Sequence, residues 1–360
     1  MTEHEQNELN ALRTALLSWY RKHRRELPWR QDRDAYRVWV SEIMLQQTRV
    51  AAVLEHYRVF LEAFPTVETL AQAPEERVLA LWSGLGYYRR ARMLHRAAGV
   101  VASELGGVIP REVESLRRLP GVGRYTAAAI ASIAYGEPVA VVDGNVERVL
   151  SRMYGTLNGT QNGTENGTLN GTQHGTPRDS TPRADAIAWQ RAQELLDRRH
   201  AGDWNQAMME LGATVCTPQS PQCLTCPVLR WCGAPGAETR RPQGARKRVR
   251  MTRALIERRD RVYLVQRAAD AAKMAGMWEL PECVELVAEQ SAVGGQGAKE
   301  LCVVRHSITD TDYEVQVVSA GLKALGAGGV KAGRWVERKE IFALPLTGLT
   351  RKILRKQGLG

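Results

Sequence analysis

The sequence predicts a mainly α-helical chain followed by a smaller α+β domain, and three observations lead to this prediction. Over residues 5–230, apolar residues recur at the three- and four-residue spacing of amphipathic helices. Four of the six cysteines gather between Cys216 and Cys232, near the end of that helical part. From residue 251 onwards, short runs rich in β-branched residues replace the helical pattern.

The composition is that of a folded protein with a polyanionic partner. Lys and Arg number 50 against 39 Asp and Glu, a formal net charge of +11, which favours nucleic acid as the partner. The chain is 44% hydrophobic, enough to bury real cores. No run of about 18 apolar residues occurs, and the N-terminal segment is polar and acidic. We therefore expect a cytoplasmic monomer that does not associate with membranes.

The helical part is punctuated by Gly, Pro and Asn. The first helix is expected over 5–23, where Leu12 and Leu16 share a face and which Pro28 brings to an end. The second helix follows Asp34, a plausible N-cap. Further helices are expected at 51–63, 75–82, 89–105, 112–119, 126–135, 144–154, 184–199 and 204–213.

Two segments interrupt this plan. An Asn-Gly-Thr triplet recurs in the low-complexity stretch of about 155–182, which we interpret as a flexible surface insertion. Residues 233–250 are rich in Gly, Pro and Arg and are interpreted as a basic linker, either a solvated tether or a strap that contacts phosphates.

The expected domains are a helical region over 1–232 and an α+β domain over 251–360. In the latter, strands are expected at 252–258, 262–267, 301–306, 313–320 and 333–337, with a helix at 348–356.

The strongest local signal is the cysteine spacing Cys216-x6-Cys223-x2-Cys226-x5-Cys232. Four thiolates in a loop-rich segment can enclose a metal ion or a [4Fe–4S] cluster. Zinc sites usually contain two separated pairs of close cysteines, whereas here one cysteine stands apart and three follow at short intervals. This spacing resembles the iron–sulfur cluster loop of the endonuclease III superfamily. The resemblance implies that these four residues hold a [4Fe–4S] cluster.

The second signal is the octet Leu-Pro-Gly-Val-Gly-Arg-Tyr-Thr at 119–126. Pro120 ends one helix, and Gly121 and Gly123 permit a tight turn with positive φ angles. The next helix then presents free N–H groups and the positive end of its dipole, which together bind phosphate. The octet resembles the helix-hairpin-helix of DNA glycosylases. The resemblance implies that the DNA contacts include Gly121, Val122, Gly123 and Thr126.

The third signal is Asp143, which stands just before a helix with apolar periodicity. Taken alone, such an aspartate is an ordinary N-cap. It follows the hairpin by about twenty residues, however, where the same superfamily keeps its catalytic aspartate. The resemblance implies a catalytic Asp143, with Asn145 as a candidate for positioning.

Three further segments are similar to the MutY family of adenine DNA glycosylases within this superfamily. They are Pro-Trp-Arg at 28–30, Trp-Val-Ser-Glu-Ile-Met-Leu-Gln-Gln-Thr at 39–48 and Trp-Ser-Gly-Leu-Gly-Tyr-Tyr at 82–88. The family's essential glutamate falls at Glu42, which would otherwise be an exposed residue on a helix face. Desolvation beside a base pocket could keep it protonated. The resemblance covers 1–155 and 183–232 strongly, and it implies two helical lobes with DNA and a flipped adenine between them.

The same resemblance suggests residues that enter or contact the duplex. Gln47 and Tyr87 are placed like residues that wedge into DNA, although a helix cap and a core aromatic are alternative roles for them. Arg30, Gln46 and Thr48 are further candidates for DNA contact.

Tyr125 is informative because bifunctional members of the superfamily carry a lysine there, which forms a Schiff base with the sugar. A tyrosine cannot do so. We therefore expect a monofunctional glycosylase in which Tyr125 helps to position the reacting groups.

The implied reaction removes adenine paired with 8-oxoguanine, or with guanine, in double-stranded DNA of the bacterial nucleoid. Glu42 would protonate adenine N7, and Asp143 would stabilise the oxocarbenium ion or bond to it transiently, leaving an abasic site. One alternative is an endonuclease III-like glycosylase and AP lyase that acts on oxidised pyrimidines. Another is an iron–sulfur DNA-binding protein with no catalytic role for either carboxylate.

The C-terminal domain resembles, more loosely, the MutT-like (Nudix-like) domain of the MutY family. Met-Trp-Glu-Leu-Pro at 277–281 matches it, but the acidic magnesium-binding segment is missing after Pro281. We therefore expect a domain that reads a base and hydrolyses no nucleotide.

The family's Phe-Ser-His lesion loop falls at Ile308, Thr309 and Asp310, or at His306-Ser307 if the register shifts. Ile308 cannot stack like phenylalanine, so a weaker preference for 8-oxoguanine is expected.

Overall fold

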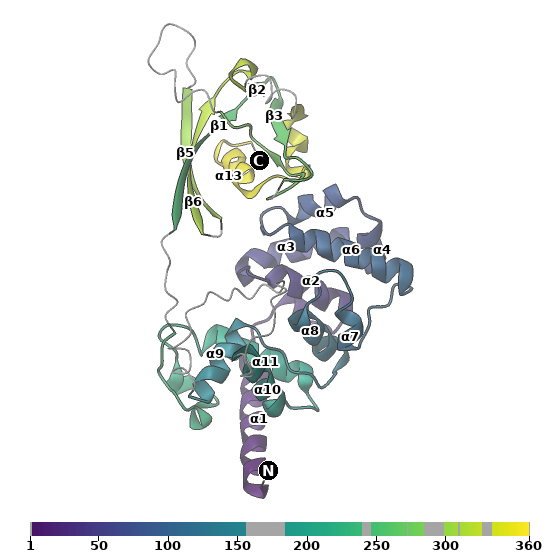
Figure 1. Cartoon of the computed structure of the whole chain (residues 1–360), viewed down its shortest axis with the longest axis vertical. Coiled ribbons are helices and arrows are strands. Elements are labelled where there is room, and N and C mark those ends of the chain that lie inside the picture. Colours follow the sequence, from purple (N-terminus) through teal and green to yellow (C-terminus); the bar gives the residue numbers. More distant parts are fainter. Residues whose placement is uncertain are drawn as a thin grey trace, which may run out of the picture. The chain divides into compact units, whose positions relative to one another are not determined.

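The computed structural model describes most of the chain (Figure 1), namely residues 2–155, 184–239, 246–271, 273–283, 299–308, 310–325 and 333–359. Nearly all of the predicted insertion, part of the predicted linker and Thr309 lie outside the described residues. Internal contacts divide the chain into two compact units. The first unit is Met1–Gln47 with Val100–Pro242, and the second is Thr48–Gly99 with Gln243–Gly360. Residues 48–99, which the sequence analysis placed in the helical region, thus group with the C-terminal strands.

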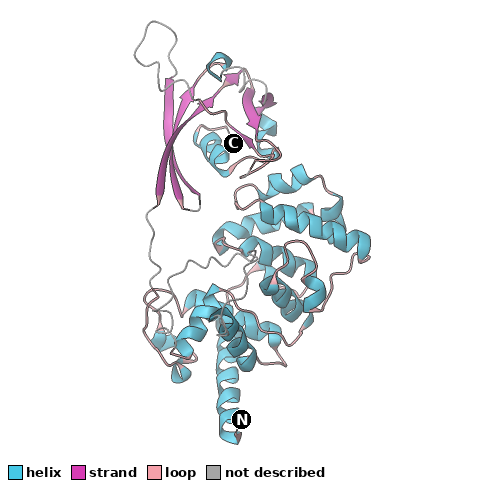
Figure 2. Ribbon diagram, viewed as in Figure 1, coloured by secondary structure: helices cyan, strands magenta, loops and turns pink. Residues whose placement is uncertain are grey.

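The described part of the first unit is helical (Figure 2). Its α-helices are α1 Glu3–His23, α2 Ala35–Leu45, α7 Val113–Leu116, α8 Arg124–Tyr135, α9 Gly144–Met153, α10 Ala184–Leu195 and α11 Ala201–Thr214. Short 3-10 helices occur at η1 Pro28–Arg30, η3 Cys223–Thr225 and η4 Leu229–Trp231. No helix in the described parts of the chain is long and apolar enough to cross a membrane.

Local capping explains where several of these helices begin. Thr2 and Glu5 form a reciprocal capping box at the start of α1. The predicted N-cap Asp34 is confirmed, because its Oδ1 accepts the Arg37 N–H at 2.8 Å. The helix predicted over 184–199 ends earlier, at Leu195, and the Asp197 side chain accepts the backbone N–H of Arg199 in the turn that follows.

Helix α11 is central to the first unit, because it packs against α1, α8 and α9. Two glycines allow this close packing. A Cβ atom at Gly202 would lie 2.7 Å from the carbonyl oxygen of Ser132, and one at Gly212 would lie 2.6 Å from Cβ of Asn145. Side chains at these positions would push α11 away from α8 and α9. The core around it includes the fully buried Trp204.

The second unit contains a helical part and a β part. Its helices are α3 Val50–Ala63, α4 Val67–Gln72, α5 Glu75–Trp82 and α6 Arg89–Glu104, the last of which continues into the first unit. Helix α4 was not predicted from the sequence; it is only six residues long and begins with a capping box at Thr66. The core between these helices includes edge-to-face contacts of Phe60 with Phe64 and with Trp82.

The β part contains two sheets. In the first, β6 Thr311–Ser319 lies between β1 Lys247–Leu255, which is parallel to it, and β5 Lys299–Ile308, which is antiparallel. In the second, β3 Arg261–Gln266 pairs antiparallel with the short β2 Glu257–Arg258 and β4 Trp278–Glu279 and with β7 Gly333–Glu337. The 3-10 helices η6 Leu322–Leu325 and η7 Arg338–Ala343 and the helix α13 Gly348–Lys356 complete it. The α+β character predicted for this region is confirmed.

Candidate active site

Glu42 is buried in the middle of α2, and only 5% of its surface is exposed. The interpretation as an exposed residue on a helix face is therefore wrong. Burial raises the pKa of Glu42 to about 7, the charge of Asp143 adds to this rise, and the hydrogen bond from Tyr125 and the charge of Arg30 oppose it. A carboxyl group with this pKa holds its proton in a large fraction of molecules at neutral pH.

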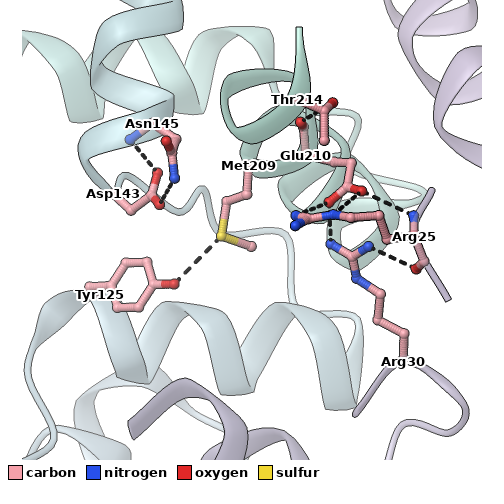
Figure 3. Close-up of polar contacts among 8 residues, drawn as sticks. All are labelled: Arg25, Arg30, Tyr125, Asp143, Asn145, Met209, Glu210 and Thr214. Carbon is pink, nitrogen blue, oxygen red and sulfur yellow. Dashed lines mark hydrogen bonds and ion pairs between the residues drawn. The ribbon is translucent and has the colours of Figure 1, made fainter. Parts of the chain in front are cut away.

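Tyr125, the second residue of α8, donates its hydroxyl hydrogen bond to Glu42 Oε2 at 2.6 Å. The same hydroxyl lies 3.5 Å from the Met209 sulfur, as Figure 3 shows. Burial, followed by the charges of Glu42 and Asp143, raises the pKa of Tyr125 well above its ordinary value. The phenol therefore remains protonated and is a permanent donor to one oxygen of Glu42. A proton carried by this carboxyl group is best held on the other oxygen.

Asp143 is the N-cap of α9, as its position before an apolar-periodic helix predicts. Its Oδ1 accepts the backbone N–H groups of Asn145 at 2.9 Å and Val146 at 2.8 Å, and its Oδ2 accepts the Asn145 side-chain amide at 2.9 Å (Figure 3). Burial raises the pKa of Asp143 above its ordinary value, and these three donors and the charge of Arg148 limit that rise. Because the charged form is bonded three times here and only once at Glu42, we assign the negative charge to Asp143 and the proton to Glu42.

A second layer of contacts fixes Asn145. Arg148 Nη2 donates to Asn145 Oδ1 at 2.9 Å and to the Gly212 carbonyl, and Arg148 Nε donates to the Cys216 carbonyl at 2.8 Å. One guanidinium thus connects the Asp143–Asn145 pair with α11 and with the start of the cysteine loop. The sequence analysis did not identify Arg148. Its only signal is a basic residue one helical turn after the asparagine.

A buried ionic cluster lies on the adjacent turn of α11. Glu210, whose side chain is fully buried, accepts two side-chain bonds from Arg25 and one from Arg30, each at 2.8 Å (Figure 3). Burial favours a higher pKa, but the two arginines outweigh it and lower the pKa of Glu210 to about 2. Arg30, predicted to contact DNA, has a side chain only 10% exposed and directed at Glu210. Arg25 and Glu210 were not among the predicted site residues, although an acid that follows the apolar pair Met208-Met209 in α11 was a usable signal.

The helix-hairpin-helix turn has one left-handed glycine, where the sequence predicted two. Gly121 has φ 76°, as predicted, but Gly123 has φ −88° and is the N-cap of α8. A Cβ at Gly123 would meet no atom within 4 Å, so the space beside the N-terminus of α8 is open. Val122 and Thr126 are buried, and the Thr126 hydroxyl accepts the Gln46 amide at 3.2 Å. The backbone around the two glycines is therefore the part of this motif that is exposed.

The two predicted wedge residues share an unusual backbone conformation. Gln47 directly follows Gln46, the C-cap of α2, and has φ 55°. Tyr87, between α5 and α6, has φ 47° and a side chain that is 47% exposed, so its alternative role as a core aromatic is wrong. Non-glycine residues rarely adopt positive φ, and those that do are concentrated at functional sites. Thr48, the third candidate in this region, accepts a hydrogen bond from Arg90 at 3.0 Å.

The four clustered cysteines lie in the loop that contains η3 and η4. Cys216 Sγ accepts a hydrogen bond from Arg152 at 3.1 Å, and Cys223 Sγ accepts the Gly236 N–H at 3.2 Å. Burial raises the pKa of Cys226 to about 11, with further contributions from the charges of the other three cysteines. The described residues contain no group of three or more His, Cys, Asp or Glu side chains that could hold a single metal ion. The thiols are thus near one another but are not arranged as a closed single-ion site.

The predicted lesion loop lies at the β5–β6 hairpin of the second unit. Ile308 is the last residue of β5, Thr309 is outside the described residues, and Asp310 is exposed just before β6. The Asp310 carboxylate accepts the Thr311 hydroxyl at 3.0 Å, and this bond lowers the pKa of Asp310. A negative charge is therefore kept at the tip of the hairpin.

Comparisons with known proteins agree with these motifs. Residues 40–169 match the family model of the HhH-GPD superfamily base excision DNA repair protein. The chain is similar to the adenine DNA glycosylase of Homo sapiens, with 49% identity over 236 residues, 63% of this chain and 40% of the human protein. It is also similar to that of Buchnera aphidicola subsp. Schizaphis graminum, with 34% identity over 218 residues, 60% of this chain and 57% of that protein.

A solved thermostable thymine-DNA glycosylase has 27% identity and a TM-score of 0.53, and the alignment covers 64% of this chain and 98% of that chain. The chain spans from 40% to 57% of the length of the two adenine glycosylases named above. The resemblance that the sequence motifs predicted, to adenine DNA glycosylases and to the helix-hairpin-helix glycosylase superfamily, is confirmed.

The cluster around Glu210 predicts a large and pH-dependent contribution to stability. Glu210→Gln leaves two arginines facing a neutral amide, and we expect it to lower the free energy of unfolding at pH 7 by about 3 kcal/mol. Because the folded pKa is depressed to about 2, the stabilisation is present above the ordinary carboxyl pKa and is lost as pH falls towards 2. Urea denaturation of wild type and variant at several pH values should show their difference shrinking in acid.

The matched control is Glu62→Gln, which removes an exposed ion pair of 3.1 Å with Arg58. Such pairs contribute roughly 0.3–0.5 kcal/mol. A Glu210→Gln effect as small as that of the control, or one that does not change with pH, would contradict the assignment.

Proposed function

We propose that this chain is a monofunctional adenine DNA glycosylase that removes adenine paired with 8-oxoguanine or guanine from double-stranded DNA during base excision repair. The observation that carries the proposal is the pair of carboxyl groups of Glu42, which is buried and has its pKa raised to about 7, and Asp143, which is half-buried and whose charged form accepts three hydrogen bonds. Such a pair provides an acid and an anion at neutral pH. The similarity to adenine DNA glycosylases supplies the substrate.

Glu42 acts as the general acid. Adenine is a poor leaving group, and protonation of its N7 allows the C1′–N9 bond to break with both electrons going to the base. The bond from Tyr125 orients the carboxyl group and leaves the proton on the oxygen that Tyr125 does not occupy. Arg30, held by Glu210, limits how far the pKa of Glu42 rises, so that the acid can still give up its proton.

Asp143 faces the positive charge that develops on the sugar. Its carboxylate stabilises the oxocarbenium ion electrostatically or bonds to C1′ transiently, as carboxylates do in sugar chemistry. A water molecule then adds to C1′ and loses a proton, which gives an abasic site and free adenine. The three hydrogen bonds to Asp143 orient the carboxylate and stabilise its charged form.

The absence of a lysine at position 125 supports hydrolysis without strand cleavage. A lyase of this superfamily requires an amine that forms a Schiff base with the sugar. Here the same position carries a partly buried phenol that already donates a hydrogen bond to Glu42.

DNA would be held by the exposed backbone around Gly121 and Gly123, where the amide groups at the start of α8 suit a phosphate. Gln47 and Tyr87 would fill the space left by the flipped adenine. Because extrusion of a base requires unstacking, residues already held in strained turns suit this role.

Removal of either carboxylic acid should abolish excision. Glu42→Gln keeps the shape but cannot deliver a proton, and Asp143→Asn removes the anion, so we expect single-turnover rates at least 10²-fold lower in each variant, with DNA binding retained. With Glu42 active as an acid, the wild-type rate should fall as pH rises through about 7. The measurement is cleavage of a duplex with adenine opposite 8-oxoguanine, followed by alkali.

Glu62→Gln is the control for loss of an exposed carboxylate, and it should leave the rate unchanged. A duplex with an oxidised pyrimidine tests the lyase alternative in the same assay. Strand breaks without alkali in that duplex would contradict the proposed mechanism. Near-normal excision by Glu42→Gln or Asp143→Asn would also contradict it.

We also propose that Cys216, Cys223, Cys226 and Cys232 hold a [4Fe–4S] cluster. Thiolates are the ligands that such clusters require, and two of the sulfurs already accept N–H bonds that stabilise ligated thiolates. The four thiols also lie near one another, since the charges of the other three cysteines raise the pKa of Cys226. Bound there, the cluster would tie together the loop whose Cys216 carbonyl receives Arg148.

Metal analysis tests this assignment. Protein prepared without oxygen should be yellow-brown and contain iron and acid-labile sulfide in equal amounts. Cys226→Ser should lose most of both, whereas Cys283→Ala, at a buried cysteine of the second unit, should lose neither. Zinc in place of iron, or the same iron content in Cys226→Ser, would contradict the proposal.

The β5–β6 hairpin is proposed to read the lesion, with a weaker preference for 8-oxoguanine than in enzymes that present Phe-Ser-His. Ile308 has no aromatic face, and the anion at Asp310 repels phosphate. The loss of one stacking partner costs about 1–3 kcal/mol, which corresponds to about 5- to 150-fold in affinity.

The triple change Ile308→Phe/Thr309→Ser/Asp310→His should therefore raise the ratio of excision opposite 8-oxoguanine to excision opposite guanine by about tenfold. Val303→Phe, which adds an aromatic ring at an exposed position in the middle of β5, is the control and should leave the ratio unchanged. An unchanged ratio in the triple variant would show that this hairpin does not read the lesion.

A further inference from the structure

We propose that Arg90 is a positioning residue that locks the two wedge-bearing turns, at Gln47–Thr48 and at Gly84–Tyr87, in the conformation that enters DNA. The proposal rests on the proposed function, because that function makes Gln47 and Tyr87 wedges. The clamp itself is carried by contacts within the second unit and does not depend on DNA.

The turn that bears Tyr87 contains three residues with left-handed backbone. Gly84 has φ 118°, Gly86 has φ 71° and Tyr87 has φ 47°. The two glycines adopt such angles at no steric cost, but Tyr87 does not. A side chain with this backbone and an exposed ring persists only when its surroundings hold it there.

Arg90 makes several of the contacts that keep the turn in this conformation. Its Nη2 donates to the carbonyl oxygens of Leu85 at 3.3 Å and Gly86 at 3.4 Å. Its guanidinium lies 5.5 Å from the ring centre of Trp82 and 5.5 Å from that of Tyr87. One guanidinium thus contacts the buried ring of Trp82, the backbone of the turn and the exposed Tyr87.

The same Nη2 also reaches the second turn. It donates to the Thr48 hydroxyl at 3.0 Å, and Thr48 directly follows Gln47, the other wedge with positive φ. Only five non-glycine residues in the described parts of the chain have positive φ: Gln47, Tyr87, Ser220, Arg259 and Met274. Arg90 bonds the residue next to one of the two predicted wedges and contacts the other.

Arg90 remains charged although it is largely withdrawn from water. Burial lowers its pKa to about 10, with a smaller opposing effect of Tyr87, so the guanidinium is still protonated at neutral pH. A fixed cation that is directed at carbonyl oxygens and aromatic faces orders these turns before DNA arrives. The ordering entropy is then lost on folding and no longer weakens DNA binding.

Lysine could not replace this arrangement. It offers one point charge, whereas the arginine bonds several acceptors and makes cation–π contacts with two rings at once. Arg90→Lys therefore keeps the charge and loses the clamp, and Arg90→Met loses both. Arg89→Met is the matched control, because Arg89 is the exposed neighbour at the start of α6.

The first experiment uses the free protein. Amide hydrogen exchange of residues 85–88 should become at least tenfold faster in Arg90→Met and Arg90→Lys, with Arg89→Met like wild type and the thermal midpoint of Arg90→Lys within a few degrees of wild type. Equal exchange in wild type and Arg90→Lys would overturn the clamp, whether or not Arg90→Met folds.

The second experiment is a double-mutant cycle on duplex DNA with adenine opposite 8-oxoguanine. Arg90→Lys should slow single-turnover excision at least fivefold in wild type and less than twofold in a Tyr87→Ala background, because it acts through Tyr87. An equal loss in both backgrounds would overturn the positioning role. If wild type excises no adenine at all, the proposed function fails, and the exchange experiment still decides the clamp.

Discussion

The hydrogen bond from Tyr125 to Glu42 is the interaction on which the site depends. It joins α2 to α8 across a buried interface, and it is the one donor that the Glu42 carboxyl receives among the bonds described here. Because the phenol cannot ionise near neutral pH, it fixes which oxygen of Glu42 is free to carry a proton. Burial raises the pKa and this bond limits the rise, so the two effects together place the acid near neutrality.

The anionic half of the site depends on how closely α11 approaches α9. Gly212 allows that approach, since a Cβ there would collide with Asn145, and Arg148 then spans Asn145, Gly212 and Cys216. The cap at Asp143 is thus braced by a neighbouring helix and by the loop of cysteines. The proposed cluster in that loop would support the proposed role of Asp143 through this arginine.

Strain and charge are concentrated where the proposed chemistry requires them. Arg25 and Arg30 both bond to the buried carboxylate of Glu210. The charge of Arg30 also limits the rise in the pKa of Glu42. At Tyr87, an exposed aromatic ring sits on a backbone that ordinary residues avoid, and Arg90 contacts both. A guanidinium thus acts on a proposed functional residue in both places, through its charge at Glu42 and through direct contacts at Tyr87.

The sequence by itself determined the features that depend on neighbours along the chain. These include the caps at Asp34 and Asp143, the left-handed Gly121 and the order of the helices and strands, because backbone angles and first-turn hydrogen bonds are local. Only the tertiary structure decided that Glu42 is buried. It also decided that Arg25 and Glu210, which are 185 positions apart, form one ion pair. These outcomes depend on which helix faces pack together, and local periodicity carries no information about the partner across a core.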